Sequence, residues 1–224
     1  MTERRFVQYI CFKTQPEWRR LPRELREKGR EEFAAALEAA APGVTAFSYS
    51  TLGMKVDSDL MLWWHSDSAE GPQEALSALL QTGLGGYCEV TYSLFGLTRP
   101  SQYTKQRTSQ EHALDEATRL KYLIVYPFTK TIEWYLQSRD VRQALMNEHM
   151  KIGHGFDDVR QVLLYTTGLD DQEFVVAYET DDLERHHQLV VALRSTESRR
   201  YTLRDTPIIT GIHRPIEQAL ALLG

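Results

Sequence analysis

Three side chains in the second half of the chain have the types and spacing for redox chemistry on an anionic ligand. Tyr126 and Lys130 close an apolar run, and His149 follows them on a segment with helical periodicity. A phenol can be oxidised, an ammonium binds carboxylates, and a neutral imidazole is a good ligand for iron. This group therefore suits a haem or another porphyrin that carries carboxylates.

The spacing around His149 favours a nitrogen ligand on an apolar helix face. Leu145, His149 and Ile152 recur at i, i+4 and i+7, so a helix would place the imidazole within an apolar stripe. Taken alone, a histidine at a helix end is more often structural than metal-binding, and a lysine after a strand is often solvated. The assignment of these residues therefore depends on the segments around them.

Composition excludes several classes of protein. The chain has 224 residues, 42% of them hydrophobic, which is enough for one domain or two small ones. Its net charge of −5 argues against nucleic acid as a partner. We expect no membrane span and no secretory signal, because no apolar run has the required length. Cys11 and Cys88 lack metal-ligand spacing, so we expect buried free thiols and a reducing, cytoplasmic setting.

The predicted elements repeat one β-α-β-β-α-β pattern twice. The first copy has strands at 6–12, 45–51, 60–65 and 87–97 and helices at 22–41 and 72–80. The second copy has strands at 121–128, 159–166, 173–180 and 207–213 and helices at 134–152 and 183–193, followed by a short helix at 216–223. The pattern predicts two ferredoxin-like units with antiparallel sheets that pack or merge, and with helices outside. We expect an N-terminal half over 1–98, a polar linker over 99–120, and a C-terminal half over 121–224 that carries the site.

Several segments of the second half resemble the chlorite dismutase and coproheme decarboxylase family of haem proteins. The segments that carry the resemblance are YLIVYPF at 122–128, EWY at 133–135, ALMNEH at 144–149, TGLDD at 167–171 and RRY at 199–201. The first half resembles the family more weakly, at 59–61 and 101–107. The resemblance implies an α+β fold in which tandem ferredoxin-like units form an antiparallel β-barrel with helices outside. It also implies haem in the C-terminal half and assembly as a homo-oligomer, commonly a pentamer.

Matched position by position, the resemblance gives four residues catalytic or ligand roles. His149 matches the iron ligand, and Glu197 matches a carboxylate on its other ring nitrogen. Tyr126 matches the radical relay of coproheme decarboxylases, and Lys130 matches a lysine that binds a propionate and supplies a proton.

Three further residues are expected to hold the porphyrin. Arg107 resembles an arginine that binds a propionate, and Ser198 is expected to do the same from the other side. Trp134, in the EWY segment, is expected to line the haem. An arginine fork pairs well with a carboxylate, although a single arginine is as often a solvated surface charge.

The distal residue separates the subfamilies. Counting from His149 places Val162 where chlorite dismutases have an arginine and many coproheme decarboxylases a glutamine. A shift of one residue would bring in Gln161, but it would reverse the faces of the strand. We therefore expect Val162 at this position, with His112 in the linker as a weak candidate for a distal group.

The resemblance implies hydrogen-peroxide-dependent oxidative decarboxylation of iron coproporphyrin III to haem b. A chlorite dismutase is the first alternative, although a valine cannot hold the anion near iron. The second alternative is a haem-binding or carrier protein without turnover. The expected partners are a small-molecule porphyrin and hydrogen peroxide.

Overall fold

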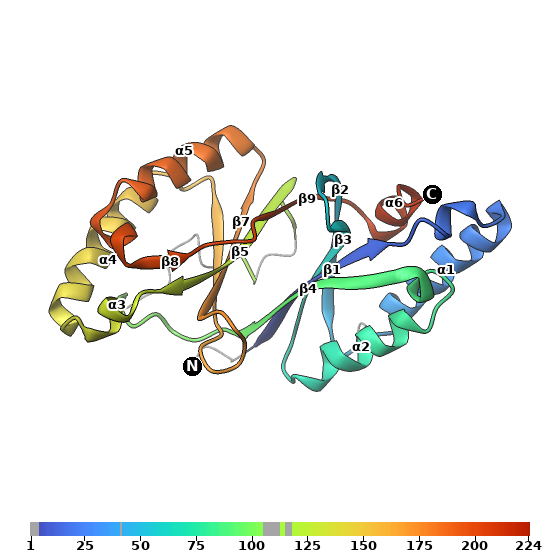
Figure 1. Ribbon diagram of the computed structural model, residues 1–224, viewed down its shortest axis with the longest axis horizontal. Helices are drawn as coiled ribbons and strands as arrows, with labels where there is room; N and C mark the ends of the chain where they lie inside the picture. The colour runs from blue at the N-terminus through green and yellow to red at the C-terminus, as the bar shows by residue number, and fades with distance from the viewer. Residues whose placement is uncertain (1–4, 41, 105–112, 115–117) are drawn as a thin grey trace. The chain divides into compact units, whose positions relative to one another are not determined.

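The computed structural model describes residues 5–40, 42–104, 113–114 and 118–224 (Figure 1). Their contacts group them into two compact units. The first unit comprises the residues before Arg99 together with Ile209–Gly224, and the second comprises Arg99–Ile208. The described residues of the linker expected from the sequence therefore group with the second unit, and the last strand and helix group with the first.

The first unit is an antiparallel sheet with helices against it. Its strands are β1 (Phe6–Thr14), β2 (Thr45–Lys55), β3 (Ser58–Ser66), β4 (Cys88–Leu97) and β9 (Ile209–His213), in the order β4-β1-β3-β2-β9. Its helices are α1 (Arg23–Ala39), α2 (Glu70–Leu80) and α6 (Ile216–Ala221), with short 3₁₀ turns η1 (Trp18–Arg20) and η2 (Gly85–Tyr87). Helix α1 begins directly after Pro22, whose ring fixes φ but offers no N–H.

Large apolar side chains fill the space between the first sheet and its helices. Trp18, Phe33, Trp64, Leu79 and Leu84 are all fully buried there. Interiors packed in this way have few voids larger than a water molecule. The first unit therefore contains a closed core.

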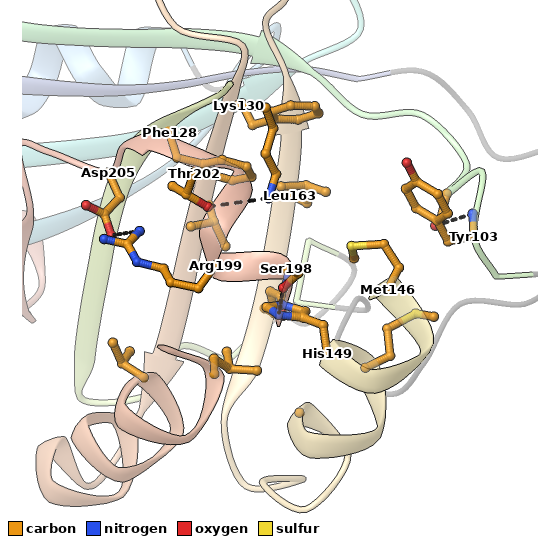
Figure 2. Close-up of a pocket in the computed structure, with 18 of the residues that line it drawn as sticks. Tyr103, Phe128, Lys130, Met146, His149, Leu163, Ser198, Arg199, Thr202 and Asp205 are labelled. Carbon is orange, nitrogen blue, oxygen red and sulfur yellow. Dashed lines mark hydrogen bonds and ion pairs between the residues drawn. The ribbon is translucent and has the colours of Figure 1, made fainter. Parts of the chain in front are cut away.

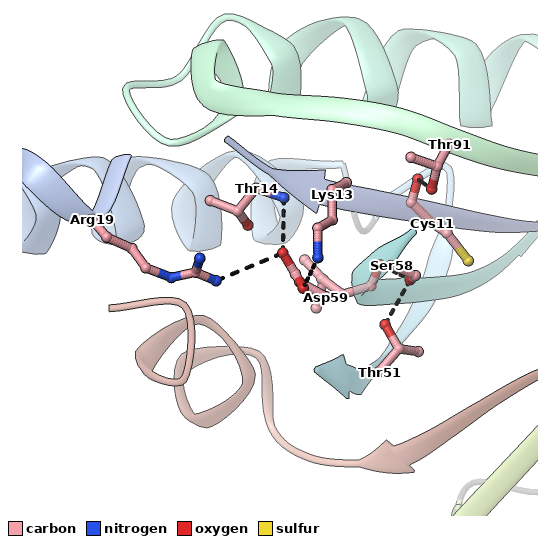
Figure 3. Close-up of polar contacts among 9 residues, drawn as sticks. Cys11, Lys13, Thr14, Arg19, Thr51, Ser58, Asp59 and Thr91 are labelled. Carbon is pink, nitrogen blue, oxygen red and sulfur yellow. Dashed lines mark hydrogen bonds and ion pairs between the residues drawn. The ribbon is translucent and has the colours of Figure 1, made fainter. Parts of the chain in front are cut away.

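A buried carboxylate ties the end of β1 to β3 (Figure 3). Asp59 accepts from Lys13 Nζ at 2.8 Å and from the backbone N–H of Thr14 at 3.0 Å, and the Arg19 guanidinium lies 3.8 Å away. A buried charge persists only where partners compensate it. These contacts explain Asp59 as a structural residue of the first unit.

The second unit repeats the strand order of the first. Its strands are β5 (Tyr122–Lys130), β6 (Arg160–Tyr165), β7 (Phe174–Thr180) and β8 (Thr202–Arg204), in the order β6-β7-β5-β8. Its helices are α3 (Ile132–Leu136), α4 (Arg139–Gly153) and α5 (Leu183–Arg194), with a 3₁₀ turn η4 (Glu197–Tyr201). In both units the fourth strand of the motif lies beside the first, and the third lies between the first and the second. The predicted duplication of a ferredoxin-like unit is confirmed.

Two boundaries differ from those expected from the sequence. The helix expected over 134–152 is two helices, because Ser138 caps α4 and its Oγ accepts from the Val141 N–H at 3.3 Å. The last strand and helix contribute to the first unit, because His213 pairs with Tyr49 and Leu220 enters the first core.

The two cysteines are unpaired in the structure. Cys11 is buried and Cys88 is half-buried. Burial raises the pKa of each thiol to about 12, so neither thiol is reactive at neutral pH. In the described part of the chain, no helix has both the length and the apolar character needed to span a membrane.

Candidate functional site

A cavity of about 250 Å³ opens between the second sheet and the helices α4 and α5 (Figure 2). All of its lining residues belong to the second unit. One water molecule needs only about 10–15 Å³ of such volume, so the cavity is far larger than a packing defect. Tyr126, Lys130 and His149 all line it.

His149 enters the cavity from α4. Met146, Met150 and Gly153 line the cavity from the same helix, as the i−3, i+1 and i+4 neighbours of His149 do on one face. Its Nδ1 lies 3.3 Å from Ser198 Oγ (Figure 2). Burial, together with the nearby charge of Lys130, lowers the pKa of His149 to about 4. The imidazole is therefore neutral at physiological pH, which is the form that binds metals.

Tyr126 comes from β5. Tyr126, Phe128 and Lys130 alternate along this strand and line the cavity, whereas Val125 and Pro127 are buried on the other face. The Tyr126 ring lies 6.1 Å from the ring of Tyr178. Burial is the main cause that raises the pKa of Tyr126. The phenol therefore keeps its proton and can act as a hydrogen donor.

Lys130 lies at the end of the same strand, and its ammonium group is near a hydroxyl group and an aromatic ring. Its Nζ is 3.4 Å from Thr202 Oγ1 and 4.7 Å from the centroid of the Trp134 ring. Burial and the neighbouring Arg199 lower the pKa of Lys130 to about 8. Among the described residues, no carboxylate lies within ion-pair distance of this Nζ. An anionic ligand would therefore find a cation that is not already neutralised.

Trp134 lines the cavity, and two residues beside it were not identified from the sequence. The Tyr103 ring lies 6.4 Å from that of Trp134, and Tyr103 Oη is buried without a hydrogen-bond partner in the described structure. Arg142 Nε is buried in the same way, and Arg142 also lines the cavity. Arg142 precedes His149 by two helical turns, a spacing that could have identified it. Buried donors without acceptors are costly, so both side chains are suited to an acceptor supplied by a ligand.

Val162, the residue expected at the distal position, does not line the cavity. Val162 is buried on the face of β6 that does not line the cavity, while Gln161, Leu163 and Tyr165 line it. Successive side chains of a strand point to opposite faces, so the one-residue difference exchanges Val162 for Gln161. From β6 the cavity therefore receives an amide side chain.

The structure places Ser198, and not Glu197, against the imidazole. The Glu197 side chain is 60% exposed and pairs with Arg200 at 2.7 Å. Ser198 is 3% exposed and lines the cavity beside His149. The 3₁₀ turn η4 sends adjacent side chains in different directions, and this orientation corrects the expected partnership of Glu197. The remaining two expectations, Arg107 and His112, lie outside the described residues.

Comparisons with known proteins agree with this fold. A family model described as chlorite dismutase matches residues 26–214. A Mycolicibacterium smegmatis protein named coproheme decarboxylase is 33% identical over 176 residues, which are 78% of this chain and 75% of that protein. An Ideonella dechloratans protein named chlorite dismutase is 28% identical over 227 residues, which cover 98% of this chain and 80% of that protein.

Solved structures of chlorite dismutases have a fold similar to that of this chain. A mutant chlorite dismutase from Candidatus Nitrospira defluvii has a TM-score of 0.91 at 28% identity, covering 99% of this chain and 96% of that one. The chlorite dismutase of the same organism in complex with imidazole has a TM-score of 0.89 at 28% identity, covering 97% and 94%. The chain belongs to the chlorite dismutase family. Its predicted α+β fold, an antiparallel β-barrel of duplicated units with helices outside, is confirmed by this match.

Proposed function

We propose that the cavity of the second unit binds an iron porphyrin, and that the chain catalyses the hydrogen-peroxide-dependent oxidative decarboxylation of iron coproporphyrin III to haem b. One observation carries the proposal. A neutral imidazole, a protonated phenol and a cation with no carboxylate partner among the described residues line a single cavity. The relative named coproheme decarboxylase supports the same reaction.

The residues of the cavity fit such a ligand. His149 would bind the iron, and Phe128, Met146 and Leu163 provide apolar surface for a flat ring. The porphyrin carries four carboxylates, which need cations and donors. Lys130 supplies a cation with no carboxylate partner among the described residues, and Arg142 supplies a buried N–H with no acceptor among them. The ligand would satisfy groups that the described protein atoms leave unpaired.

Tyr126 and Lys130 have complementary roles in the proposed reaction. The bound haem and the peroxide supply the oxidising power. Tyr126 gives up its phenolic hydrogen atom and then recovers one from the propionate. Loss of carbon dioxide and of a second electron leaves a vinyl group, and each peroxide accepts two electrons and two protons to form two waters. Lys130 binds the reacting carboxylate and provides a proton, as an ammonium with a pKa of about 8 can.

The side chains that β6 contributes to the cavity argue against chlorite dismutation as the main activity. From β6 the cavity receives Gln161 and Leu163, and the neighbouring Arg160 instead donates to the Thr118 carbonyl at 2.8 Å. An amide provides no positive charge to hold a chlorite anion. These side chains thus favour decarboxylation, and oxygen release from chlorite would reverse this order.

The test of the proposed reaction is turnover of ferric coproporphyrin III with hydrogen peroxide, followed by mass spectrometry. We expect the successive loss of two carbon dioxide molecules. Tyr126→Phe removes the phenolic hydrogen and should slow turnover by about 10²-fold or more. Tyr122→Phe, a substitution of the same kind on the same strand but outside the cavity lining, should keep the wild-type rate.

Two outcomes would reject the proposed reaction. Full turnover by Tyr126→Phe would remove the tyrosine relay. Tight binding of haem by the wild-type protein without any decarboxylation would indicate a carrier. Assembly into a ring and residence in a reducing compartment stay predictions, to be checked by the mass of the oligomer in solution and by cell fractionation.

A further inference from the structure

A chain of hydroxyl groups leads from His149 to the end of helix α5. Ser198 Oγ lies 3.3 Å from His149 Nδ1, and Thr196 Oγ1 lies 2.9 Å from Ser198 Oγ. Thr196 Oγ1 in turn donates to the carbonyl of Leu193 at 2.7 Å. Thr196 and Ser198 are both buried, so solvent does not compete for these contacts. Figure 2 shows Ser198 directed at the imidazole.

The direction of each hydrogen bond follows from the carbonyl at the end of the chain. A carbonyl oxygen only accepts, so the single hydroxyl proton of Thr196 points to Leu193. Thr196 Oγ1 must then accept at its contact with Ser198, which uses the single hydroxyl proton of Ser198. Ser198 Oγ is left as the acceptor toward His149, so Nδ1 carries the imidazole proton. Only this arrangement supplies one proton to each of the three contacts.

The acceptor at the end of the chain belongs to the last turn of α5. Carbonyls in the last turn of a helix lack intrahelical partners and carry the negative end of the helix dipole. The Leu193 carbonyl therefore provides a partial negative charge at the end of the chain of hydroxyl groups. Among the described residues, Ser198 is the one hydrogen-bond partner of the His149 side chain.

We infer that Ser198 and Thr196 are positioning residues that hold His149 as its Nδ1–H tautomer, with the Nε2 lone pair free for the ligand of the cavity. The inference rests on the proposed function, since the relay matters only if the cavity binds an iron porphyrin through this nitrogen. Unlike a carboxylate, the hydroxyl relay is neutral. It fixes the proton on Nδ1 without placing a full charge beside the imidazole.

The tautomer can be measured in the protein without porphyrin. Nitrogen-15 NMR of labelled histidine distinguishes Nδ1–H from Nε2–H rings, and comparison with His149→Gln identifies the signal among the seven histidines. We expect His149 to be mainly Nδ1–H. Thr196→Val keeps the shape of the side chain but removes the acceptor, so the Ser198 proton becomes available to Nδ1. The ratio of the Nδ1–H to the Nε2–H form should then fall about fivefold, because a net hydrogen bond contributes on the order of 1 kcal/mol.

Two control variants separate the relay from a general packing role. Thr196→Ser retains the hydroxyl and should restore the wild-type ratio, although it loses a buried methyl group. Ser195→Ala removes the neighbouring hydroxyl, which donates instead to Val191, and should leave the ratio unchanged. The affinity for iron coproporphyrin III should fall in Thr196→Val by about the same factor as the ratio and recover in Thr196→Ser.

Each result of the tautomer measurement either supports or overturns the inference. A mainly Nε2–H His149 in the wild-type protein overturns it, as does an unchanged ratio in Thr196→Val. Because the tautomer is measured without porphyrin, failure of the proposed function has a different signature. A wild-type protein with the expected tautomer that binds no iron porphyrin would support the relay and reject the function.

Discussion

The two units use the same strand order and register, yet one encloses a core and the other a cavity. Ile10 pairs with Leu62 in the first unit as Tyr126 pairs with Val176 in the second. By the same register, Trp64 of β3 is equivalent to Tyr178 of β7. Phe33 lies as far along the chain after β1 as His149 lies after β5. Apolar residues of the first core therefore stand where the second unit has two tyrosines and a histidine.

The helices show the same difference. Helix α1 buries Phe33 and also Gly29, which allows Trp18 and Leu84 to approach closely. Helix α4 has no fully buried residue, because its inner face is turned toward open space. One scaffold thus becomes a stabilising core or a binding site according to the side chains at a few equivalent positions.

The strongest test of this difference is a matched pair of alanine substitutions. Phe33→Ala should lower the free energy of unfolding by about 3–5 kcal/mol, because a fully buried aromatic ring leaves a cavity behind. His149→Ala should lower it by less than about 1 kcal/mol in the protein without porphyrin, because the ring lines a space that is already open. Urea unfolding of both variants provides the measurement. Equal losses would contradict the assignment of core and site.

A pair of glycine substitutions tests the helices with a smaller effect. A Cβ at position 29 would lie 2.9 Å from the Leu84 backbone nitrogen and 2.9 Å from the Trp18 ring, so Gly29→Ala should cost about 1–3 kcal/mol. A Cβ at position 153 meets nothing within 4 Å, so Gly153→Ala should be neutral or stabilising by up to about 1 kcal/mol. Thermal unfolding measures both. A destabilising Gly153→Ala would show that the inner face of α4 is packed.

The Lys130 side chain in the cavity predicts that the affinity for the porphyrin depends on pH. The apolar core of the first unit has no counterpart to this charge. Lys130 has a lowered pKa of about 8, so below this pH it is already an ammonium in the free protein. Above pH 8 it must take up a proton to pair with a carboxylate, and the affinity for iron coproporphyrin III should fall by up to about tenfold per pH unit.

Lys130→Met is the control for this dependence. Its affinity at pH 7 should be weaker than that of the wild type, and its pH profile above pH 8 should be flatter. Absorption titrations between pH 7 and about pH 10 give both profiles. Parallel profiles would exclude Lys130 as the group that pairs with the ligand.

The smallest effect is expected at Glu197, the carboxylate that the family resemblance predicts as the partner of the imidazole. Glu197→Gln should change porphyrin affinity by less than about 0.5 kcal/mol, since the side chain is exposed and pairs with Arg200. The measurement is the porphyrin affinity of Glu197→Gln compared with that of the wild-type protein. A loss of tenfold or more would restore the carboxylate as the partner of His149 and refute the hydroxyl relay.

The sequence predicted the parts of the molecule that depend on local periodicity. The strands and helices of both units follow from patterns of apolar residues and from the Pro and Gly residues at their ends. Tyr126 and His149 both line the cavity, but Leu145 and Ile152, the apolar residues expected on the His149 face, do not. Ser138 is a residue type that caps helices, so it is a sequence signal for the break between α3 and α4. The helix predicted over 134–152 does not include this break.

The errors arise where tertiary structure sets the direction of a side chain. The face of β6 depends on the turn after α4, so counting from His149 selected Val162 in place of Gln161. The choice between Glu197 and Ser198 depends on how η4 packs against α4, which leaves no periodic pattern in the sequence. Both errors concern a shift of one residue, and both change the chemistry of the site.

The most direct test of the central claim is an absorption titration with ferric coproporphyrin III. The wild-type protein should bind one equivalent with the spectrum of an imidazole-ligated iron, and His149→Ala should lose that ligation. His154→Ala, which removes a second histidine from the cavity lining, should keep it. An imidazole-ligated spectrum that persists in His149→Ala would contradict the account.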